Sequence, residues 1–205
     1  MSLTPVTWSL FIDTAVGVLP NSLIKTDHDN QDTYTAAARS VESIAAFNEG
    51  AGVQFYFTYS LNLSIACGLV KTYTDTQAST MDFGIANRFG ACRVWELGSI
   101  VFNGPGFDSA TDLASIIINA GGFPEYQKNG VTFYTSLVPA TYPLFVKGAL
   151  MSWNGAELTD VNIVVPFVPP PVASLYSGGS SGVPKKRAEG ESLLALYAML
   201  KEKNL

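Results

Sequence analysis

The side chains that could support nucleophilic or acid–base chemistry are few and scattered in this chain of 205 residues. His28 is the one histidine, and it lies between Asp27 and Asp29 in a very polar stretch that is typical of an exposed loop. A Ser–His or Cys–His pair would depend on this residue, because such a nucleophile needs a neighbouring base. The sequence has no glycine-rich phosphate-binding motif, and nothing singles out two acids for glycoside chemistry. We therefore predict no catalytic residue and no cofactor, and we expect a protein that is not an enzyme.

Metal ligands are also sparse. The loop Asp27–Asp32 holds three carboxylates in six residues, and oxygen-rich loops of this kind can bind calcium. It lacks the glycine and the twelfth-position acid of a helix–loop–helix calcium site, where Ala38 stands instead. We predict a solvated loop that is dispensable for folding, with a calcium site shared between subunits as the alternative. Cys67 and Cys92 are predicted to be buried free thiols, and with one histidine they are too few for a four-ligand zinc site.

Positive charge is concentrated near the C-terminus. Residues 1–172 carry a net charge of −7, from seven Lys and Arg against fourteen Asp and Glu. An acidic body of this kind does not attract nucleic acid by bulk electrostatics. Lys185, Lys186 and Arg187 form the densest basic cluster, which could contact RNA phosphates or an acidic partner. The alternative is a solubilising flank beside a linker.

The body of the chain has the composition of many short strands. Val, Ile, Thr, Phe and Tyr are frequent, and Gly and Pro interrupt them at short intervals. The predicted strands are Thr7–Ile12, Val53–Ile65, Ala91–Phe102, Ser115–Asn119, Val131–Ser136, Leu144–Trp153 and Asp160–Val168. Ala36–Phe47 is predicted to form a short helix, and Asp108–Ala114 one more helical turn.

The segment 53–65 shows the clearest periodicity. Val53, Phe55, Phe57 and the apolar residues up to Ile65 share one parity, whereas Gln54, Tyr56 and the following polar residues share the other. A period of two places these sets on opposite faces of a strand. This pattern predicts one long antiparallel strand with a core face and a polar face.

The sequence predicts a domain followed by a tail. Residues 1–172 form the predicted β-sandwich, residues 173–184 a Pro/Gly/Ser linker, and residues 185–205 the basic cluster and an amphipathic helix. Leu193, Leu196, Tyr197 and Leu200 fall on one side of that helix. Because a helix this short is marginal alone, we expect it to dock onto a neighbouring subunit as an assembly tail. An apolar content of 47% and a mean hydropathy of +0.21 also favour assembly. No signal peptide and no apolar run of about 20 residues is apparent.

Two stretches carry a family resemblance. The first runs from Phe83 to Phe102 (FGIANRFGACRVWELGSIVF) and precedes the turn Asn103–Gly106, and the second, Val161–Val168 (VNIVVPFV), ends in prolines. Over about residues 50–170 the chain resembles the jelly-roll coat proteins of small RNA viruses, tymovirus-like or picornavirus-like. The resemblance implies an antiparallel jelly-roll sandwich that assembles with copies of itself or sister subunits into an icosahedral capsid, made in the host cytoplasm and found in the virion. The chain lacks the basic N-terminal arm of many coat proteins, as tymovirus-like ones also do, so any RNA contact would be weak and made by the tail.

A second hypothesis fits the same strand pattern. Trp8, Trp95, Trp153 and the many Tyr and Phe residues would usually fill a core or an interface. They could instead line one face of a carbohydrate- or receptor-binding β-sandwich, such as a spike or lectin-like module. Exposed aromatic residues on one face would favour this alternative over the capsid subunit.

Overall fold

The computed structural model describes residues 2–26, 33–57, 64–88, 90–108, 111–151 and 156–166. The chain divides into two units, residues 1–168 and 169–205, of which the second lies outside the described residues. The described part of the first unit is almost entirely β-strand and confirms the predicted all-β antiparallel sandwich. The predicted C-terminal helix and the predicted boundary at residue 172 lie outside these residues. No helix in the described ranges is long and apolar enough to span a membrane.

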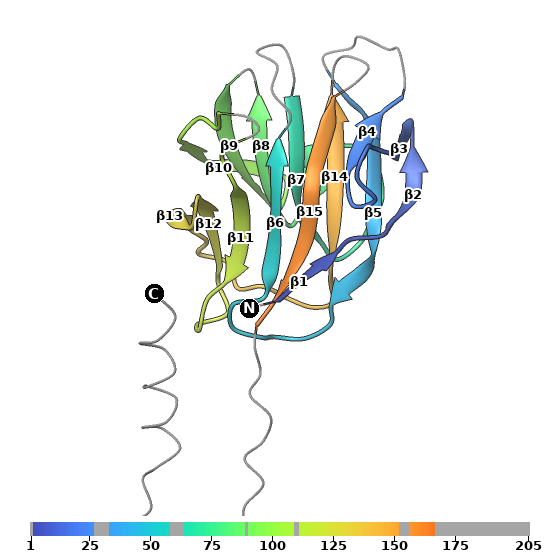
Figure 1. Ribbon diagram of the computed structural model, residues 1–205. Coiled ribbons are helices and arrows are strands. Elements are labelled where there is room, and N and C mark those ends of the chain that lie inside the picture. The colour runs from blue at the N-terminus through green and yellow to red at the C-terminus, as the bar shows by residue number, and fades with distance from the viewer. Residues whose placement is uncertain are drawn as a thin grey trace, which may run out of the picture. The chain divides into compact units, whose positions relative to one another are not determined.

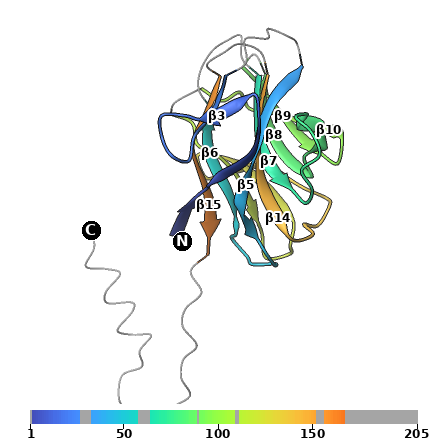
Figure 2. The same cartoon turned by 90° about the vertical axis from the view of Figure 1, so that its right-hand side faces the viewer.

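Two antiparallel sheets stack face to face (Figures 1 and 2). Sheet A has the order β13-β12-β11-β6-β15-β4-β3, with β1 also paired to β15. Its strands are β1 (Ser2–Pro5), β3 (Thr14–Val16), β4 (Leu23–Lys25), β6 (Gly52–Phe57), β11 (Ala114–Ile118), β12 (Pro124–Lys128), β13 (Val131–Thr135) and β15 (Glu157–Val165). Sheet B has the order β10-β9-β8-β7-β14-β5-β2. Its strands are β2 (Trp8–Ile12), β5 (Tyr34–Ile44), β7 (Ser64–Val70), β8 (Phe83–Arg88), β9 (Ala91–Glu96), β10 (Ser99–Gly104) and β14 (Leu144–Met151).

Successive strands wind between the two sheets. The pairs β4–β5, β6–β7 and β14–β15 each place one strand in either sheet. In sheet A, β15 lies between β4 and β6, and in sheet B, β14 lies between β5 and β7. The three pairs are therefore wound together in the manner of a jelly roll.

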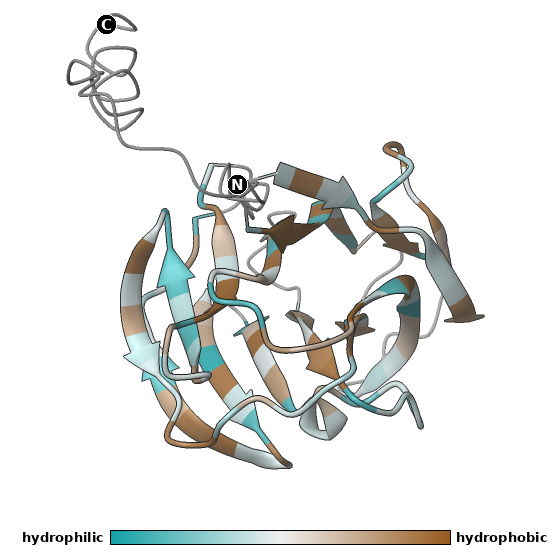
Figure 3. Ribbon diagram, turned by 90° about the horizontal axis from the view of Figure 1, so that it is seen from below, coloured by the Kyte–Doolittle hydropathy of each residue, from teal (hydrophilic) through white to brown (hydrophobic). Residues whose placement is uncertain are grey.

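The main core lies between the sheets. Buried and half-buried residues alternate along β6, so this strand gives one side to the interior, and Figure 3 shows apolar and polar residues along the strands of both sheets. Val53, Phe55 and Phe57 of β6 meet residues of sheet B such as Ile65 and Ile85 in this cluster. A second cluster lies on the other side of sheet B and includes Ala37, Ala66, Ala86 and Ala149 with Met81.

The prediction of a helix over Ala36–Phe47 is wrong, because this segment contributes to strand β5. Ala36 and Ala38 face the core between the sheets, whereas Ala37 faces the second cluster. A strand buried on both sides shows no alternation of polar and apolar residues. Its run of alanines then resembles a helix, since alanine has the highest helix propensity. The helical turn predicted over 108–114 reduces, in the described part, to one hydrogen bond from Asp112 N–H to Asp108 O at 3.1 Å.

The single long strand predicted over Val53–Ile65 is also wrong. Its described parts belong to β6 in sheet A and β7 in sheet B, and residues 58–63 lie outside the described residues. The predicted core parity is confirmed for Val53, Phe55 and Phe57, which are at most 1% exposed. Likewise, 91–102 is a hairpin of β9 and β10 with Leu97 and Gly98 at positive φ in the turn.

Candidate binding face

The outer side of sheet A presents polar side chains on neighbouring strands. Since the core residues of β6, β11 and β12 alternate with the others, the intervening residues point away from the sandwich. We call this surface the polar face, and it consists of Gln54, Tyr56, Ser115, Ile117, Glu125, Gln127, Thr159, Asp160 and Asn162.

One row of this face runs across four adjacent strands. Gln127 of β12 pairs with Ser115 of β11, which pairs with Gln54 of β6, which pairs with Asn162 of β15. Ser115 Oγ donates a hydrogen bond to Gln127 Oε1 at 3.3 Å. Ser115 and Asn162 are buried, and the Asn162 amide is paired with Asn21 and Asp160. Gln54 and Gln127 are half-buried, and Gln127 Nε2 donates to Thr132 Oγ1 at 3.3 Å. Of this row, the Gln54 amide is the group that can still offer an uncharged donor and acceptor to a ligand, and Gln127 contributes its half-buried side chain.

An aromatic ring lies beside this row. Tyr56 is two residues from Gln54 on β6 and pairs with Thr159 of β15. It is half-buried, with part of its side chain open to solvent. The Gln54 amide and the Tyr56 hydroxyl form no hydrogen bond with other residues in the described ranges. Both groups are thus free to contact a ligand, and Tyr offers a flat apolar surface with a polar end.

Two carboxylates flank the row on opposite strands. Glu125 of β12 accepts hydrogen bonds from Asn119 Nδ2 and Thr132 Oγ1, each at 3.1 Å. Asp160 lies in a bulge of β15 with φ of 50°. Its Oδ1 accepts from Asn162 Nδ2 at 2.9 Å and from Asn21 Nδ2 at 3.2 Å. These neutral donors orient both carboxylates without neutralising them.

No cation of the described ranges lies on the polar face. The Lys and Arg residues of the described ranges lie elsewhere. Sheet B and the segment that follows β7 hold Arg39, Lys71, Arg88, Arg93 and Lys147. In sheet A, Lys25 of β4 and Lys128 of β12 have the same parity as the core residues of their strands. The electrostatic character of the face is therefore set by its carboxylates.

The outer side of sheet B is covered in its middle by the chain itself. The segment 71–82, which includes the short 3₁₀ helix Ala78–Thr80, packs Ala78 and Met81 onto the alanines of β5, β7, β8 and β14. Thr76 and Gln77 side chains donate to the carbonyl of Tyr34 on β5, the latter at 2.9 Å. We call this segment the strap. It covers the middle of the outer side of sheet B, over β5, β7, β8 and β14.

A buried lysine holds the strap. Lys147 of β14 is fully buried. Its Nζ donates to Thr80 Oγ1 at 2.6 Å and to the Gln77 carbonyl at 2.8 Å, and it lies 3.3 Å from Asp75 Oδ1. Burial lowers the pKa of Lys147, and the Asp75 carboxylate offsets this only in part. A lysine with all its donors used by the protein is a structural anchor rather than a ligand contact.

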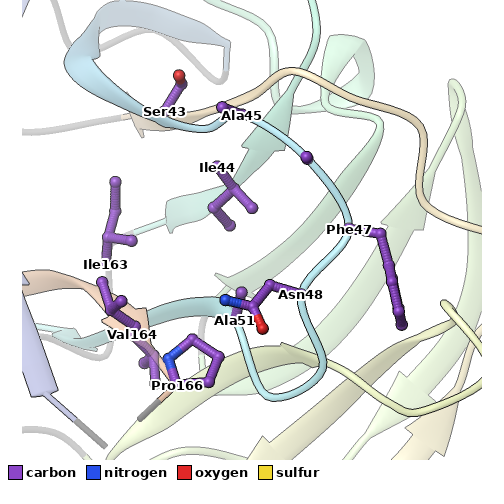
Figure 4. Close-up of a pocket in the computed structure, with 11 residues that line it drawn as sticks. Ser43, Ile44, Ala45, Phe47, Asn48, Ala51, Ile163, Val164 and Pro166 are labelled. Atoms are coloured by element: carbon purple, nitrogen blue, oxygen red, sulfur yellow. The ribbon is translucent and has the colours of Figure 1, made fainter. Parts of the chain in front are cut away.

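A cavity of about 360 Å³ opens where the connection between β5 and β6 meets the end of β15 (Figure 4). Its walls include Ile44, Phe47, Ala51, Ile163 and Pro166, with Ser43 and Asn48 as its polar side chains. It holds no charged group. Such walls suit an aliphatic or aromatic group, whereas a hydroxyl-rich ligand finds far more partners on the polar face.

The structure tests some of the residues singled out in the sequence and leaves others outside the described ranges. Cys67 and Cys92 are buried free thiols as predicted, and burial raises the pKa of both, that of Cys92 to about 12. Trp8 belongs to the core, and Trp95 is half-buried against the second cluster. The described ranges hold no group of His, Cys, Asp and Glu suited to a metal. His28, Trp153, the loop Asp27–Asp32, the tail residues Leu193, Leu196, Tyr197 and Leu200, and the basic cluster Lys185–Arg187 lie outside the described residues, so their roles stay predictions.

The sequence predicts only the part of the polar face that lies on β6. The alternation over 53–57 did place Gln54 and Tyr56 together on a polar side. Ser115, Gln127 and Asn162 carry no signal of their own, because their alignment with Gln54 depends on long-range strand register.

Comparison with known proteins supports the fold. No known protein family and no curated protein matches the sequence. Solved structures do resemble it: the PSpry domain of TRIM65 has a TM-score of 0.54 at 10% identity, covering 79% of this chain and 93% of that one. The carbohydrate recognition domain of Emp46p in its metal-free form has a TM-score of 0.55 at 8% identity, covering 77% and 88%. The SPRY domain of human HERC1 has a TM-score of 0.50 at 13% identity, covering 80% and 97%. At such low identity these likenesses show a shared β-sandwich fold and nothing more.

Proposed function

We propose that this chain is a carbohydrate-binding β-sandwich module whose binding site is the polar face of sheet A. The observation that carries the proposal is the in-register row Gln127–Ser115–Gln54–Asn162, in which the Gln54 amide has no partner in the described ranges, beside the half-buried side chain of Tyr56. Amide side chains both donate and accept hydrogen bonds, as sugar hydroxyls do. A Tyr side chain offers a flat apolar surface that matches the C–H side of a sugar ring.

The contrast between the two sheets supports this choice. The strap and Lys147 cover the middle of sheet B, whereas the Gln54 and Tyr56 side chains keep their hydrogen-bonding groups free within the described ranges. A phosphate-rich ligand such as nucleic acid would need cations, and the polar face has none among the described residues. That one structural neighbour is a carbohydrate recognition domain is consistent with this use of the fold.

Binding fits this face better than glycoside hydrolysis. Glu125 and Asp160 lie on β12 and β15, three strand spacings apart, which puts them at least about 14 Å from each other. Glycosidases hold their two carboxyl groups about 5 to 9.5 Å apart. Glu157, the other acid on this side of β15, accepts a hydrogen bond from Val18 N–H at 3.2 Å and so faces the connection between β3 and β4. We therefore propose recognition without catalysis.

A glycan array followed by titration calorimetry tests the proposal. The wild-type protein is expected to bind a subset of glycans, and Tyr56→Ala or Gln54→Ala to weaken that binding at least about tenfold, a change of about 1.4 kcal/mol. Thr74→Ala is the control, since Thr74 is exposed on the strap over the opposite sheet. Absence of binding to any glycan, or equal affinity of Tyr56→Ala and wild type, would contradict the proposal.

A second candidate, the structural subunit of a viral capsid, is favoured by apolar side chains at the side of the sandwich formed by β2 and β3. Leu10, Phe11 and Ile12, with Val16, Val18 and Leu19, are all exposed within ten residues. Apolar surface concentrated in this way is typical of contacts between subunits. Copies of the chain would then be the partners, in a virion. Analytical ultracentrifugation with negative-stain microscopy distinguishes the two: closed particles support the capsid subunit, and a monomer that binds glycans supports the first proposal.

A further inference from the structure

We infer that the polar face takes an oligosaccharide of several rings, uncharged or bearing amino groups, laid across the strands, and that it discriminates against anionic glycans. This inference rests on the proposed function and adds the size and charge of the ligand to it. Two features carry it: the extent of the hydrogen-bonding row and the signs of the charges around it.

The extent of the row sets the size of the ligand. Gln127 of β12 and Gln54 of β6 are half-buried members of the row, and the half-buried Asp160 lies beside its buried β15 member Asn162. Neighbouring strands are about 4.8 Å apart, so the row spans about 14 Å perpendicular to the strands. A single sugar ring cannot contact both ends of such a row. A chain of about three rings can place one ring over each pair of neighbouring strands, with Tyr56 under a central ring.

The charges set the chemistry of the ligand. Glu125 lies at the β12 end of the row and Asp160 at the β15 end, and the partners that orient them are neutral amides and a hydroxyl. No Lys or Arg of the described ranges shares the face. Carboxylates accept hydrogen bonds from hydroxyl and ammonium groups but offer none to a sulfate or a uronic acid. An anionic ring at either end therefore meets a like charge that no cation of the described residues on this face offsets.

A panel of three sugar series tests the inference by calorimetry on the full chain. The probes are neutral gluco- and manno-oligosaccharides, chitosan oligomers as cationic ligands, and oligogalacturonates as anionic ligands, each from one ring to six. Affinity is expected to rise at least about tenfold from one ring to three and then to level off. Oligogalacturonates should bind at least about tenfold more weakly than neutral chains of equal length, and added salt should reduce that gap because it screens exposed charges.

Glu125→Gln is the matched variant, since it removes one charge while keeping the length of the side chain. It is expected to raise the affinity for oligogalacturonate relative to the neutral chain of the same length, with an unchanged melting temperature. Equal affinity for one ring and for three, or equal binding of neutral and anionic chains, would overturn this inference and leave the proposed function standing. Failure of all three series and of the glycan array would overturn the proposed function itself.

Discussion

Phe57 illustrates how single residues hold the sandwich together. Its side chain is 1% exposed. The centre of its ring lies 5.1 Å from that of Phe55 and 5.4 Å from that of Phe107, and both contacts are edge-to-face. We expect Phe57→Ala to lower the free energy of unfolding by about 3–5 kcal/mol, because it leaves a cavity in a close-packed core. Urea unfolding measures the change, with Val41→Ala, at an exposed position, as a control that should cost under about 0.5 kcal/mol. An unchanged urea midpoint for Phe57→Ala would show that this ring is not in the core.

Asp75 gives a pH-dependent prediction at the same scale. Burial acts to raise the pKa of Asp75, but hydrogen bonds from Thr80 and the Gln77 N–H, with the charge of Lys147, outweigh it and lower the pKa. A carboxyl whose pKa is lowered on folding contributes stability above its unfolded pKa, about 3.9, and loses it as the pH falls through the folded value.

The Asp75→Asn variant should therefore be less stable than wild type at pH 7. The difference should shrink below about pH 4 and vanish once the wild-type carboxyl is protonated. Urea unfolding of both proteins at several pH values tests this, and a gap that is the same at neutral and acidic pH would contradict it. Lys147 acts on stability in the opposite sense. Because its pKa is lowered on folding, its charge destabilises the folded protein below the folded pKa, and this destabilisation disappears as the pH rises towards 10.4.

Among the elements, β6 and β11 approach each other at a glycine. A Cβ added to Gly52 would lie 2.0 Å from the Ile116 carbonyl oxygen of β11. Gly52→Ala must therefore push the two strands apart, and we expect a cost of about 1–3 kcal/mol and, because Gln54 is on the same strand, weaker glycan binding. Thermal unfolding and calorimetry check both effects. Gly130→Ala is the control for the steric effect, since a Cβ added there meets no atom within 4 Å. The positive φ of Gly130 adds backbone strain to this control. A Gly52→Ala protein as stable as wild type would show that the strands are not this close.

Some strands could be predicted from the sequence and others could not. Strand-favouring composition and turn residues identified β2, β11, β13, β14 and β15. Alternation identified β6 and its polar side, because the outer side of β6 lies outside the core. It failed at β5, where the strap buries the second side and an alanine run mimics a helix. It also fused β6 with β7, since both strands have alternating apolar residues of the same parity and only the fold assigns them to different sheets. The site depends on register between strands far apart in the chain, which local pattern does not encode.

Across the whole molecule, the open edges of both sheets are short or irregular. β3 has three residues, and β2, β10 and β13 each pair with their neighbours through a bulge or shift of register. Edges of this kind resist strand-to-strand pairing between copies. Any assembly of the chain would therefore use side-chain contacts, such as the exposed apolar residues near β2, rather than a continuous sheet. The flat sides of the sandwich are then the surfaces open to ligands, and only sheet A leaves its middle uncovered within the described residues.

The central claim, that sheet A binds a glycan through its polar face, is tested most directly by nuclear magnetic resonance. Isotope-labelled protein would be titrated with the neutral trisaccharide that binds best in the panel, and backbone amide shifts would be followed. We expect the largest changes on β6, β11, β12 and β15, centred on Gln54 and Tyr56, with sheet B and the strap unaffected. Shifts confined to β5, β7, β8 or β14, or to the walls of the apolar cavity, would contradict the account.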